Sequence, residues 1–174
     1  MQGTLQRYCD VAANLATTAL CVGILVSLIQ HHGTSDYADR GGSKPALVVG
    51  APFPELPGAS YGRHRLTLAV FLNTRCIACQ ESVPDYDMFH KAVANSNGIQ
   101  FVGVFKRESS QAIADFGFRS QAVQVQDFGP FRVSGTPTTV LIGNNGKIID
   151  FWIGRLPAKA SEKILQRIKG GVGW

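Results

Sequence analysis

An apolar run that ends just before two closely spaced cysteines places the strongest constraint on how this chain folds. Residues Leu66–Leu72 have the near-continuous apolar character of a strand covered on both faces. Cys76 and Cys79 follow at the start of a helical pattern, where a spacing of three residues puts both side chains on one face. Their Cα atoms are then close enough for a disulfide, which is the geometry of a redox switch. A second motif, Gly135-Thr136-Pro137-Thr138-Thr139, leads directly into another β-like run and makes this interpretation more specific.

Apolar patterns and turn signals predict one α/β domain over residues 47–171. Two long strands joined by a right-handed crossover should pair in parallel, a hairpin around Asn144-Asn145-Gly146 should extend the sheet antiparallel, and helices should cover both faces. The expected strands are 66–72, 99–105, 121–126 (a short edge strand), 138–142 and 147–153; the expected helices are 76–94, 109–116 and 157–169.

Several apolar side chains are predicted to fill the core of this domain. The proline-rich segment that begins at Leu47 is incompatible with a helix or a central strand, so it should pack irregularly with two of its apolar residues buried. The predicted core residues of this segment and of the first and last helices are Phe53, Leu56, Val83, Met88, Phe89, Val93, Ile164, Leu165 and Ile168.

The segment Val11–Ile29 contains no charged residue and would form a helix about 28 Å long, close to the hydrocarbon thickness of a bilayer. It is interpreted as a transmembrane anchor, with a cleaved signal sequence as the alternative. Residues 1–10 would be a short tail and residues 30–46 a polar, glycine-rich tether. Either interpretation implies that the domain after this segment is exported. The expected location is the inner (cytoplasmic) membrane, single-pass, with the domain facing the periplasm or cell exterior.

Charge and cysteine content exclude two other classes of protein. The net charge of +5 is scattered, and Lys106-Arg107 is the only adjacent basic pair, so no nucleic-acid partner is expected. Of the four cysteines, Cys9 and Cys21 lie in or beside the apolar N-terminal segment. This leaves a single neighbouring pair in the folded domain, which rules out a disulfide framework.

The two motifs and their setting resemble the membrane-tethered thiol-disulfide oxidoreductases of the TlpA/ResA/DsbE type, a redoxin-domain group with a thioredoxin fold. The resemblance covers roughly residues 47–170. It rests on matching stretches at the start of the domain, around the cysteines, in the first helix and around the hairpin: Val49-Gly50-x-Pro52-x-Pro54-x-Leu56-Pro57, Val70–Cys79, Pro84, Gly135–Ile142 and Gly146-Lys147-Ile148.

The resemblance implies thiol-disulfide exchange with exported partner proteins, with reduction of the partner as the preferred direction. Cys76 would be the attacking cysteine, because unpaired N–H groups and the dipole at a helix start favour its thiolate. Cys79, one turn inward, would be the resolving cysteine. The only redox group would be the Cys76–Cys79 disulfide, without further cofactor or metal, and electrons would arrive from a membrane thiol carrier. The partner is expected to contact Arg75, Ile77, Ala78, Thr136 and Pro137, with a cis bond between the last two.

The chain departs from the family pattern at several positions. Arg75 stands where the family usually has Trp, and it is either a solvated residue or a group that tunes Cys76 or recognises an acidic partner. The middle dipeptide, Ile77-Ala78, lacks Pro. Ser82 occupies a position where some relatives have Glu. Glu81, one residue earlier, is interpreted as a helix-start acid rather than a proton shuttle.

Three other functions remain open from the sequence. Copper delivery is the first alternative, although His64 and His90 are the only histidines of the domain and neither has a partner at ligand spacing. A peroxiredoxin is the second, although Asn73 and Ala69 stand where that family has a hydroxyl residue and Pro. A non-catalytic binding module is the third, and replacement of either cysteine would then leave its activity intact.

Overall fold

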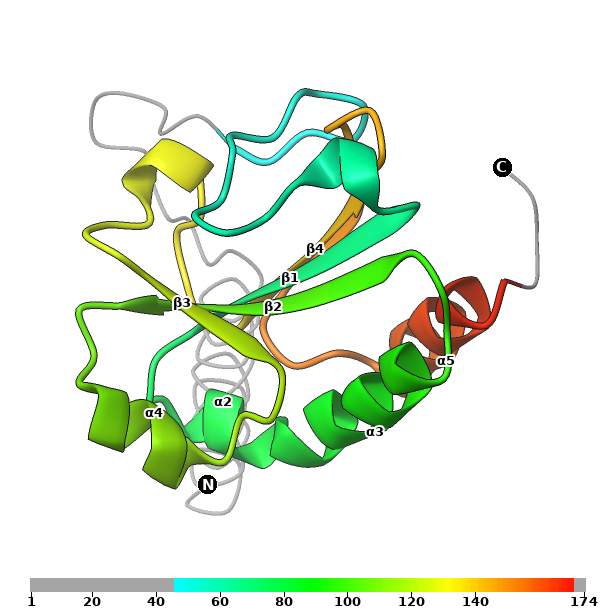
Figure 1. The fold of residues 1–174 in the computed structure, drawn as a ribbon. Helices are drawn as coiled ribbons and strands as arrows, with labels where there is room; N and C mark the ends of the chain where they lie inside the picture. The colour runs from blue at the N-terminus through cyan, green and yellow to red at the C-terminus, as the bar shows by residue number, and fades with distance from the viewer. Residues whose placement is uncertain (1–45, 171–174) are drawn as a thin grey trace, which may run out of the picture. The chain divides into compact units, whose positions relative to one another are not determined.

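A mixed sheet of five strands in the order β3-β2-β1-β4-β5 forms the centre of the molecule (Figure 1). Strand β1 pairs in parallel with β2 and antiparallel with β4; β2 pairs in parallel with β3, and β4 pairs antiparallel with β5. The strands are β1 Leu66–Leu72, β2 Ile99–Lys106, β3 Gln121–Val125, β4 Thr138–Gly143 and β5 Ile148–Ile153. The predicted order of strands and helices along the chain, the parallel pairing of the first two strands, the edge position of β3 and the β4–β5 hairpin are confirmed.

This computed structural model describes residues 46–170. The predicted tail, the predicted span 11–29 and all but the last residue of the predicted tether lie outside that range. Within residues 46–170, no helix has both the length and the apolar character needed to span a bilayer.

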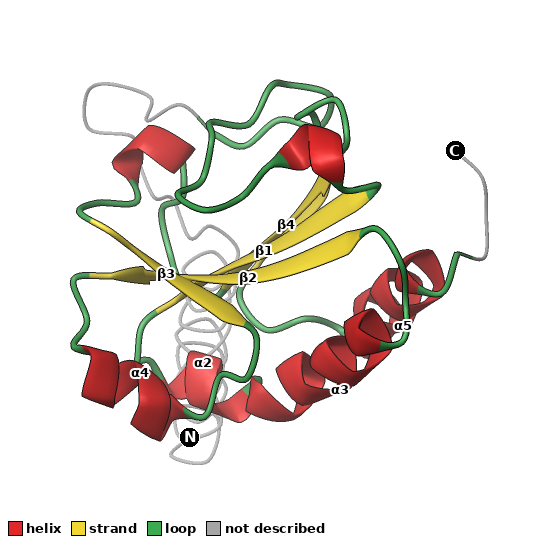
Figure 2. Cartoon of the chain, in the orientation of Figure 1, coloured by secondary structure: helices red, strands yellow, loops and turns green. Residues whose placement is uncertain are grey.

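The α-helices all pack on one face of the sheet, on the same side in Figure 2. The opposite face carries the irregular segment that follows residue 46 and two single-turn 3-10 helices. The prediction that helices would cover both faces is therefore confirmed for α-helices on one face only, and the other face has only the two 3-10 helices among residues 46–170. The helices are η1 Tyr61–Arg63, α2 Ile77–Glu81, α3 Val83–Ala94, α4 Ser110–Phe116, η2 Gly129–Phe131 and α5 Ala158–Ile168.

Strand β1 is buried along its whole length because both of its faces are covered. Leu68, Val70 and Leu72 point toward the α-helices, whereas Ala69 and Phe71 face the other layer. In that second layer the ring of Phe71 packs against the ring of Phe53, with 6.1 Å between centroids. The prediction that Phe53 and Leu56 are buried is confirmed.

The predicted helix over 76–94 is interrupted at Ser82, which was not expected. Pro84 has no N–H to continue the ladder and lies in the first turn of α3, where proline is tolerated. The interruption changes which residues face the sheet. Tyr86 and Phe89 are 3% and 0% exposed, whereas the predicted core residue Met88 is 44% exposed.

The predicted end signals of two other elements are confirmed. The Ser109 hydroxyl accepts a hydrogen bond from the N–H of Ala112 at 3.1 Å and caps α4, which ends at Gly117 in the left-handed conformation. At the hairpin turn, Gly146 has a φ of 71°.

The last helix, α5, buries Ile164 and Ile168 as predicted.

Candidate functional site

The turn that leaves β1 is held rigidly just before the first cysteine. The N–H of Arg75 donates to Asn73 Oδ1 at 2.8 Å, and the N–H of Cys76 donates to the Asn73 carbonyl at 3.1 Å. Glu108, which follows β2, accepts from both the Thr74 hydroxyl at 3.0 Å and the Thr74 N–H at 3.3 Å. The carboxylate therefore clamps the turn to the end of the neighbouring strand. Sequence reasoning did not find Glu108.

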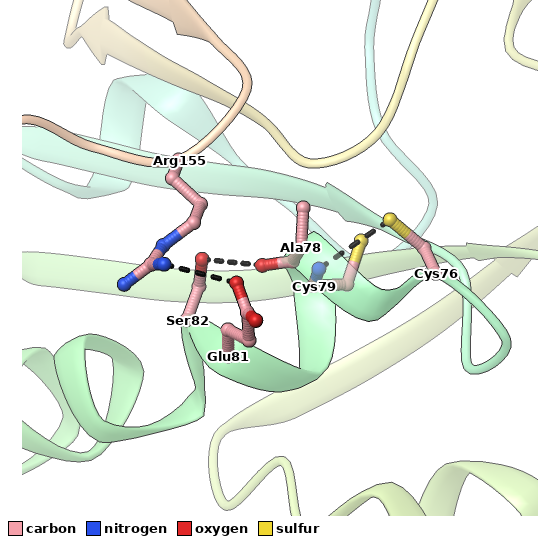
Figure 3. A network of polar contacts seen from close by, with 6 residues as sticks. All are labelled: Cys76, Ala78, Cys79, Glu81, Ser82 and Arg155. Atoms are coloured by element: carbon pink, nitrogen blue, oxygen red, sulfur yellow. Dashed lines mark hydrogen bonds and ion pairs between the residues drawn. The ribbon is translucent and has the colours of Figure 1, made fainter.

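Cys76 is the N-cap residue of α2. Its sulfur accepts a hydrogen bond from the backbone N–H of Cys79 at 3.4 Å, as Figure 3 shows. An N–H at a helix start has no carbonyl partner within the helix, so a sulfur at the N-cap position takes the place of that partner. The same donor stabilises a negative charge on the sulfur better than it stabilises a neutral thiol.

Thr136 lies against Cys76 although 60 residues separate them in the sequence. The Cys76 thiol donates to the Thr136 carbonyl oxygen at 3.4 Å. The Thr136–Pro137 peptide bond is cis, as expected. The carbonyl of Pro137 in turn accepts from the N–H of Gly154 at 2.7 Å, which brings the end of β5 beside this loop.

The two cysteines have opposite acid–base behaviour. Partial burial acts to raise the pKa of Cys76, but hydrogen bonds from the Cys79 thiol, the Thr136 side chain and the N–H groups of Cys79 and Ala78 outweigh it, so the pKa is lowered. Burial is the largest cause of the opposite shift at Cys79, followed by its hydrogen bond with Cys76, and its pKa rises to about 12. Both cysteines are free thiols in this structure, and Cys79 is 0% exposed.

Comparison with known proteins gives matches among solved structures. A candidate thiol:disulfide interchange protein, DsbE from Chlorobium tepidum, is 22% identical, with 72% of this chain and 100% of that chain covered and a TM-score of 0.60. The thioredoxin domain of a thiol-disulfide oxidoreductase from Bacteroides vulgatus is 18% identical, with coverages of 70% and 98% and a TM-score of 0.56. StoA from Bacillus subtilis is 18% identical, with coverages of 70% and 98% and a TM-score of 0.53.

The fold is thioredoxin-like. No protein-family model and no curated protein matches the chain. The solved structures confirm the expectation of a thioredoxin-like mixed α/β sheet, and membrane tethering stays a prediction.

The remaining predicted site residues surround the cysteine pair of this thioredoxin-like fold. Arg75 is exposed, Ile77 is 71% exposed and Ala78 is half-buried. Pro137 is buried, and Thr136 is partly exposed. The structure thus brings all seven predicted residues to one region, whereas the contacts of Arg75, Ile77 and Ala78 with a partner stay predictions.

A polar network lies on the far side of Cys79, at the break between α2 and α3 (Figure 3). The buried Ser82 hydroxyl donates to the Ala78 carbonyl at 2.7 Å. Glu81 is the last residue of α2, and its carboxylate pairs with Arg155 at 2.9 Å. The interpretation of Glu81 as a helix-start acid is therefore wrong, because the helix ends there. Arg155 gave no signal in the sequence, since it is far from Glu81 along the chain.

An open hollow lies on the other side of Thr136 and is called here the Thr136 hollow. Its volume is about 730 Å³. Polar side chains from three separate segments line it, among them Asn73, Lys106, Asp127, Arg132 and Ser134. Sequence reasoning did not find this feature, because the segments are brought together only by the order of the strands.

Metal ligands do not gather in the part of the chain that the structure describes. Across residues 46–170 there is no cluster of three or more histidine, cysteine or carboxylate side chains able to hold an ion. His90 instead contacts the Ser120 hydroxyl, with 2.9 Å between Nδ1 and Oγ.

Proposed function

We propose that the protein is a thiol-disulfide oxidoreductase that exchanges disulfides with partner proteins through Cys76 and Cys79. The observation that carries the proposal is the contrast between the two sulfurs. Cys76 is partly exposed, accepts a helix-start N–H and has a lowered pKa, whereas Cys79 is fully buried with a raised pKa. One sulfur is thus prepared to attack an outside disulfide, and the other is kept protonated until a mixed disulfide has formed.

The reaction follows from this contrast in two steps. The Cys76 thiolate attacks one sulfur of the partner disulfide, and the other partner sulfur leaves as a thiolate and takes up a proton from water. Cys79 then gives up its proton, and its sulfur attacks the Cys76 sulfur. The Cys76–Cys79 disulfide closes and the second partner sulfur leaves, taking the equivalent of the Cys79 proton. Two electrons pass from the protein to the partner.

Exposed apolar side chains around Cys76 support a polypeptide as the partner. Ile77, beside Cys76, and Ile153, at the end of β5, are 71% and 59% exposed. Ile153 is the register partner of Thr138, so it lies close to the Thr136–Pro137 loop. Among residues 46–170, no hydrogen bond uses the N–H of Thr136. Within the described part of the chain, that group therefore remains available to pair with an extended partner segment.

The direction and place of the reaction are part of the same proposal. Reduction of exported partner proteins is the preferred direction, with electrons supplied by a membrane thiol carrier and with residues 11–29 as the anchor. This part rests on the apolar N-terminal segment and on the sequence resemblance to tethered oxidoreductases.

Trapping of the mixed disulfide tests the proposal directly. In the Cys79→Ser variant of the full chain, the resolving step is blocked, so covalent adducts with partner proteins should accumulate in the native membrane fraction. Diagonal electrophoresis followed by mass spectrometry would identify them. The Cys76→Ser/Cys79→Ser double variant is the matched control and should form none. If the adducts form equally in the control, or are absent from both variants, Cys76 is not the attacking group.

A further inference from the structure

The Thr136 hollow is placed to receive the part of a partner that lies next to its reacting cysteine. Thr136 lines the hollow, and its carbonyl oxygen is 3.4 Å from the Cys76 sulfur. An extended chain advances about 3.3 Å per residue. A partner whose sulfur is bonded to Cys76 therefore has residues two to four positions away within reach of the hollow.

The side chains that line the hollow carry a net positive charge. Its charged side chains are Lys106, Asp127 and Arg132. Lys106 and Asp127 pair with each other at 3.0 Å, whereas Arg132 has no carboxylate partner among residues 46–170. The Asn73 oxygen is already used by the N–H of Arg75, which leaves the Asn73 amide group as a donor.

The backbone at Arg132 is unusual for a residue with a large side chain. Arg132 ends η2 with a φ of 59°, in the left-handed region that favours glycine. A residue with a large side chain is disfavoured at such a position, and residues held in this way gather at ligand-binding sites. Arg132 lines the hollow, and among residues 46–170 its guanidinium has no carboxylate partner.

We infer that the Thr136 hollow binds an acidic side chain of the partner polypeptide, two to four residues from the partner cysteine, through Arg132. The inference rests on the proposed thiol-disulfide exchange and specifies which partners it favours. A guanidinium and a carboxylate form two parallel hydrogen bonds, so Arg132 selects carboxylate-bearing segments over neutral or basic ones. Lys106 supports the same selection, because it neutralises the Asp127 carboxylate, which would otherwise repel an acidic side chain.

Charge-matched peptides test the inference on the full chain in its reduced form. Each peptide has one cysteine, activated as a mixed disulfide with uncharged thiopyridine, and carries two glutamates or two lysines either before or after that cysteine. Attack by Cys76 on the peptide sulfur releases thiopyridone, which is followed by absorbance. For the wild-type chain at low salt, we expect the better glutamate peptide to react about three- to tenfold faster than its lysine counterpart, with a smaller ratio at high salt.

Three variants isolate the contribution of Arg132. Arg132→Glu should abolish or invert the preference. Arg132→Gly should abolish it without loss of thermal stability, because glycine suits the left-handed backbone. Lys159→Glu, which makes the same charge change on the exposed part of α5, should keep the preference.

The outcomes separate this inference from the proposed function. The rate of exchange with uncharged hydroxyethyl disulfide is measured for each protein, and the peptide rates are divided by it, so that only the ratio between glutamate and lysine peptides is compared. Exchange with the uncharged disulfide but no difference between glutamate and lysine peptides in the wild type overturns the inference alone. No exchange with any disulfide overturns the proposed function and the inference together. If the glutamate preference is absent from the wild type and appears only in Asp36→Asn/Asp39→Asn, the occupant of the hollow in the native protein is this chain's own preceding segment, and the inference is wrong.

Discussion

Cys76 and Cys79 differ in their surroundings far more than in their position along the chain. Cys76 is affected by its N-cap position, by the Thr136 loop and by the neighbouring Cys79 thiol. The side chain of Cys79 instead lies in the core between its own helix and the sheet. Because the Cys79 thiol donates to Cys76, the resolving cysteine also helps to activate the attacking one before any partner arrives.

The pH dependence of alkylation checks this coupling. The lowered pKa predicts that Cys76 reacts with iodoacetamide at pH values where an ordinary thiol is still protonated. Cys79→Ala removes a donor, so the alkylation midpoint should move to higher pH, whereas Cys79→Ser keeps a donor and should move less. The rate is measured for the Cys76 peptide by mass spectrometry. An unchanged midpoint in Cys79→Ala would show that the Cys79 thiol contributes nothing.

Arg75→Ala supplies a comparison in the same experiment. The Arg75 side chain is exposed, and solvent screens the effect of an exposed charge. We therefore expect a smaller midpoint shift than in Cys79→Ala. A larger shift would assign the main tuning role to Arg75.

At the scale of the elements, the loop after α4 packs closely against β2 through the ring of Phe118. A Cβ atom placed on Gly103 of β2 would lie 2.6 Å from the ring of Phe118. That ring cannot move freely, because it also packs against Phe101 and Phe105, with centroids 5.2 and 5.9 Å away. The absence of a side chain at Gly103 is thus what lets Phe118 lie flat on the sheet.

Gly103→Ala should lower the free energy of unfolding by about 1–3 kcal/mol through overpacking. Urea unfolding followed by tryptophan fluorescence measures the change. Gly62→Ala is the matched control, since a Cβ at Gly62 meets no atom within 4 Å, and its stability should be unchanged or slightly higher. Equal stability of the two variants would contradict the described packing of Phe118.

Which elements could be predicted from the sequence depended on how local their signals are. The β4–β5 hairpin was predictable because Asn145 and Gly146 carry the turn within adjacent residues. The break at Ser82 was not, because Pro84 is compatible with the inside of a kinked helix as well as with the first turn of a new one.

The arrangement of the helices required the order of the strands. Both crossovers, β1-α3-β2 and β2-α4-β3, advance in the same direction across the sheet, so right-handed connections place both helices on one face. Cys76, Cys79, Thr136 and Pro137 could be found because they belong to two recognisable motifs. Glu108 could not, because it acts on Thr74, which is far from it in sequence. Arg132 could not, because the hollow that it lines forms only when several segments of the chain come together.

At the scale of the whole molecule, buried acidic groups predict a loss of stability in alkaline solution. Burial raises the pKa of Tyr61 to about 12, above its ordinary value of 10.0. A group whose pKa is raised on folding contributes stability that is complete below its unfolded pKa and is lost as pH rises toward the folded value. Cys79 acts in the same sense, with an ordinary value of 9.0 and a folded value of about 12.

Tyr61→Phe tests this prediction in two pH ranges. At pH 7 the variant should be less stable by about 1 kcal/mol, because it lacks the 2.7 Å hydrogen bond from the Tyr61 hydroxyl to the Pro54 carbonyl. Between pH 10 and 12 the difference should shrink, since phenylalanine has no proton to lose. Urea unfolding at pH 7 and pH 11 gives both values. A constant difference would mean that the hydroxyl of Tyr61 stays solvated in the folded state.

The contact between Cys76 and Thr136 cannot form until the chain has folded as far as β4. Strand β4 must insert beside β1 before the Thr136 carbonyl can reach the sulfur. A nascent chain, or a proteolytic fragment that stops short of residue 136, therefore lacks this contact and the Thr136 contribution to the Cys76 pKa. Under the proposed function, Cys76 is therefore fully activated only in a chain that extends beyond β4, and a shorter copy should exchange disulfides less readily.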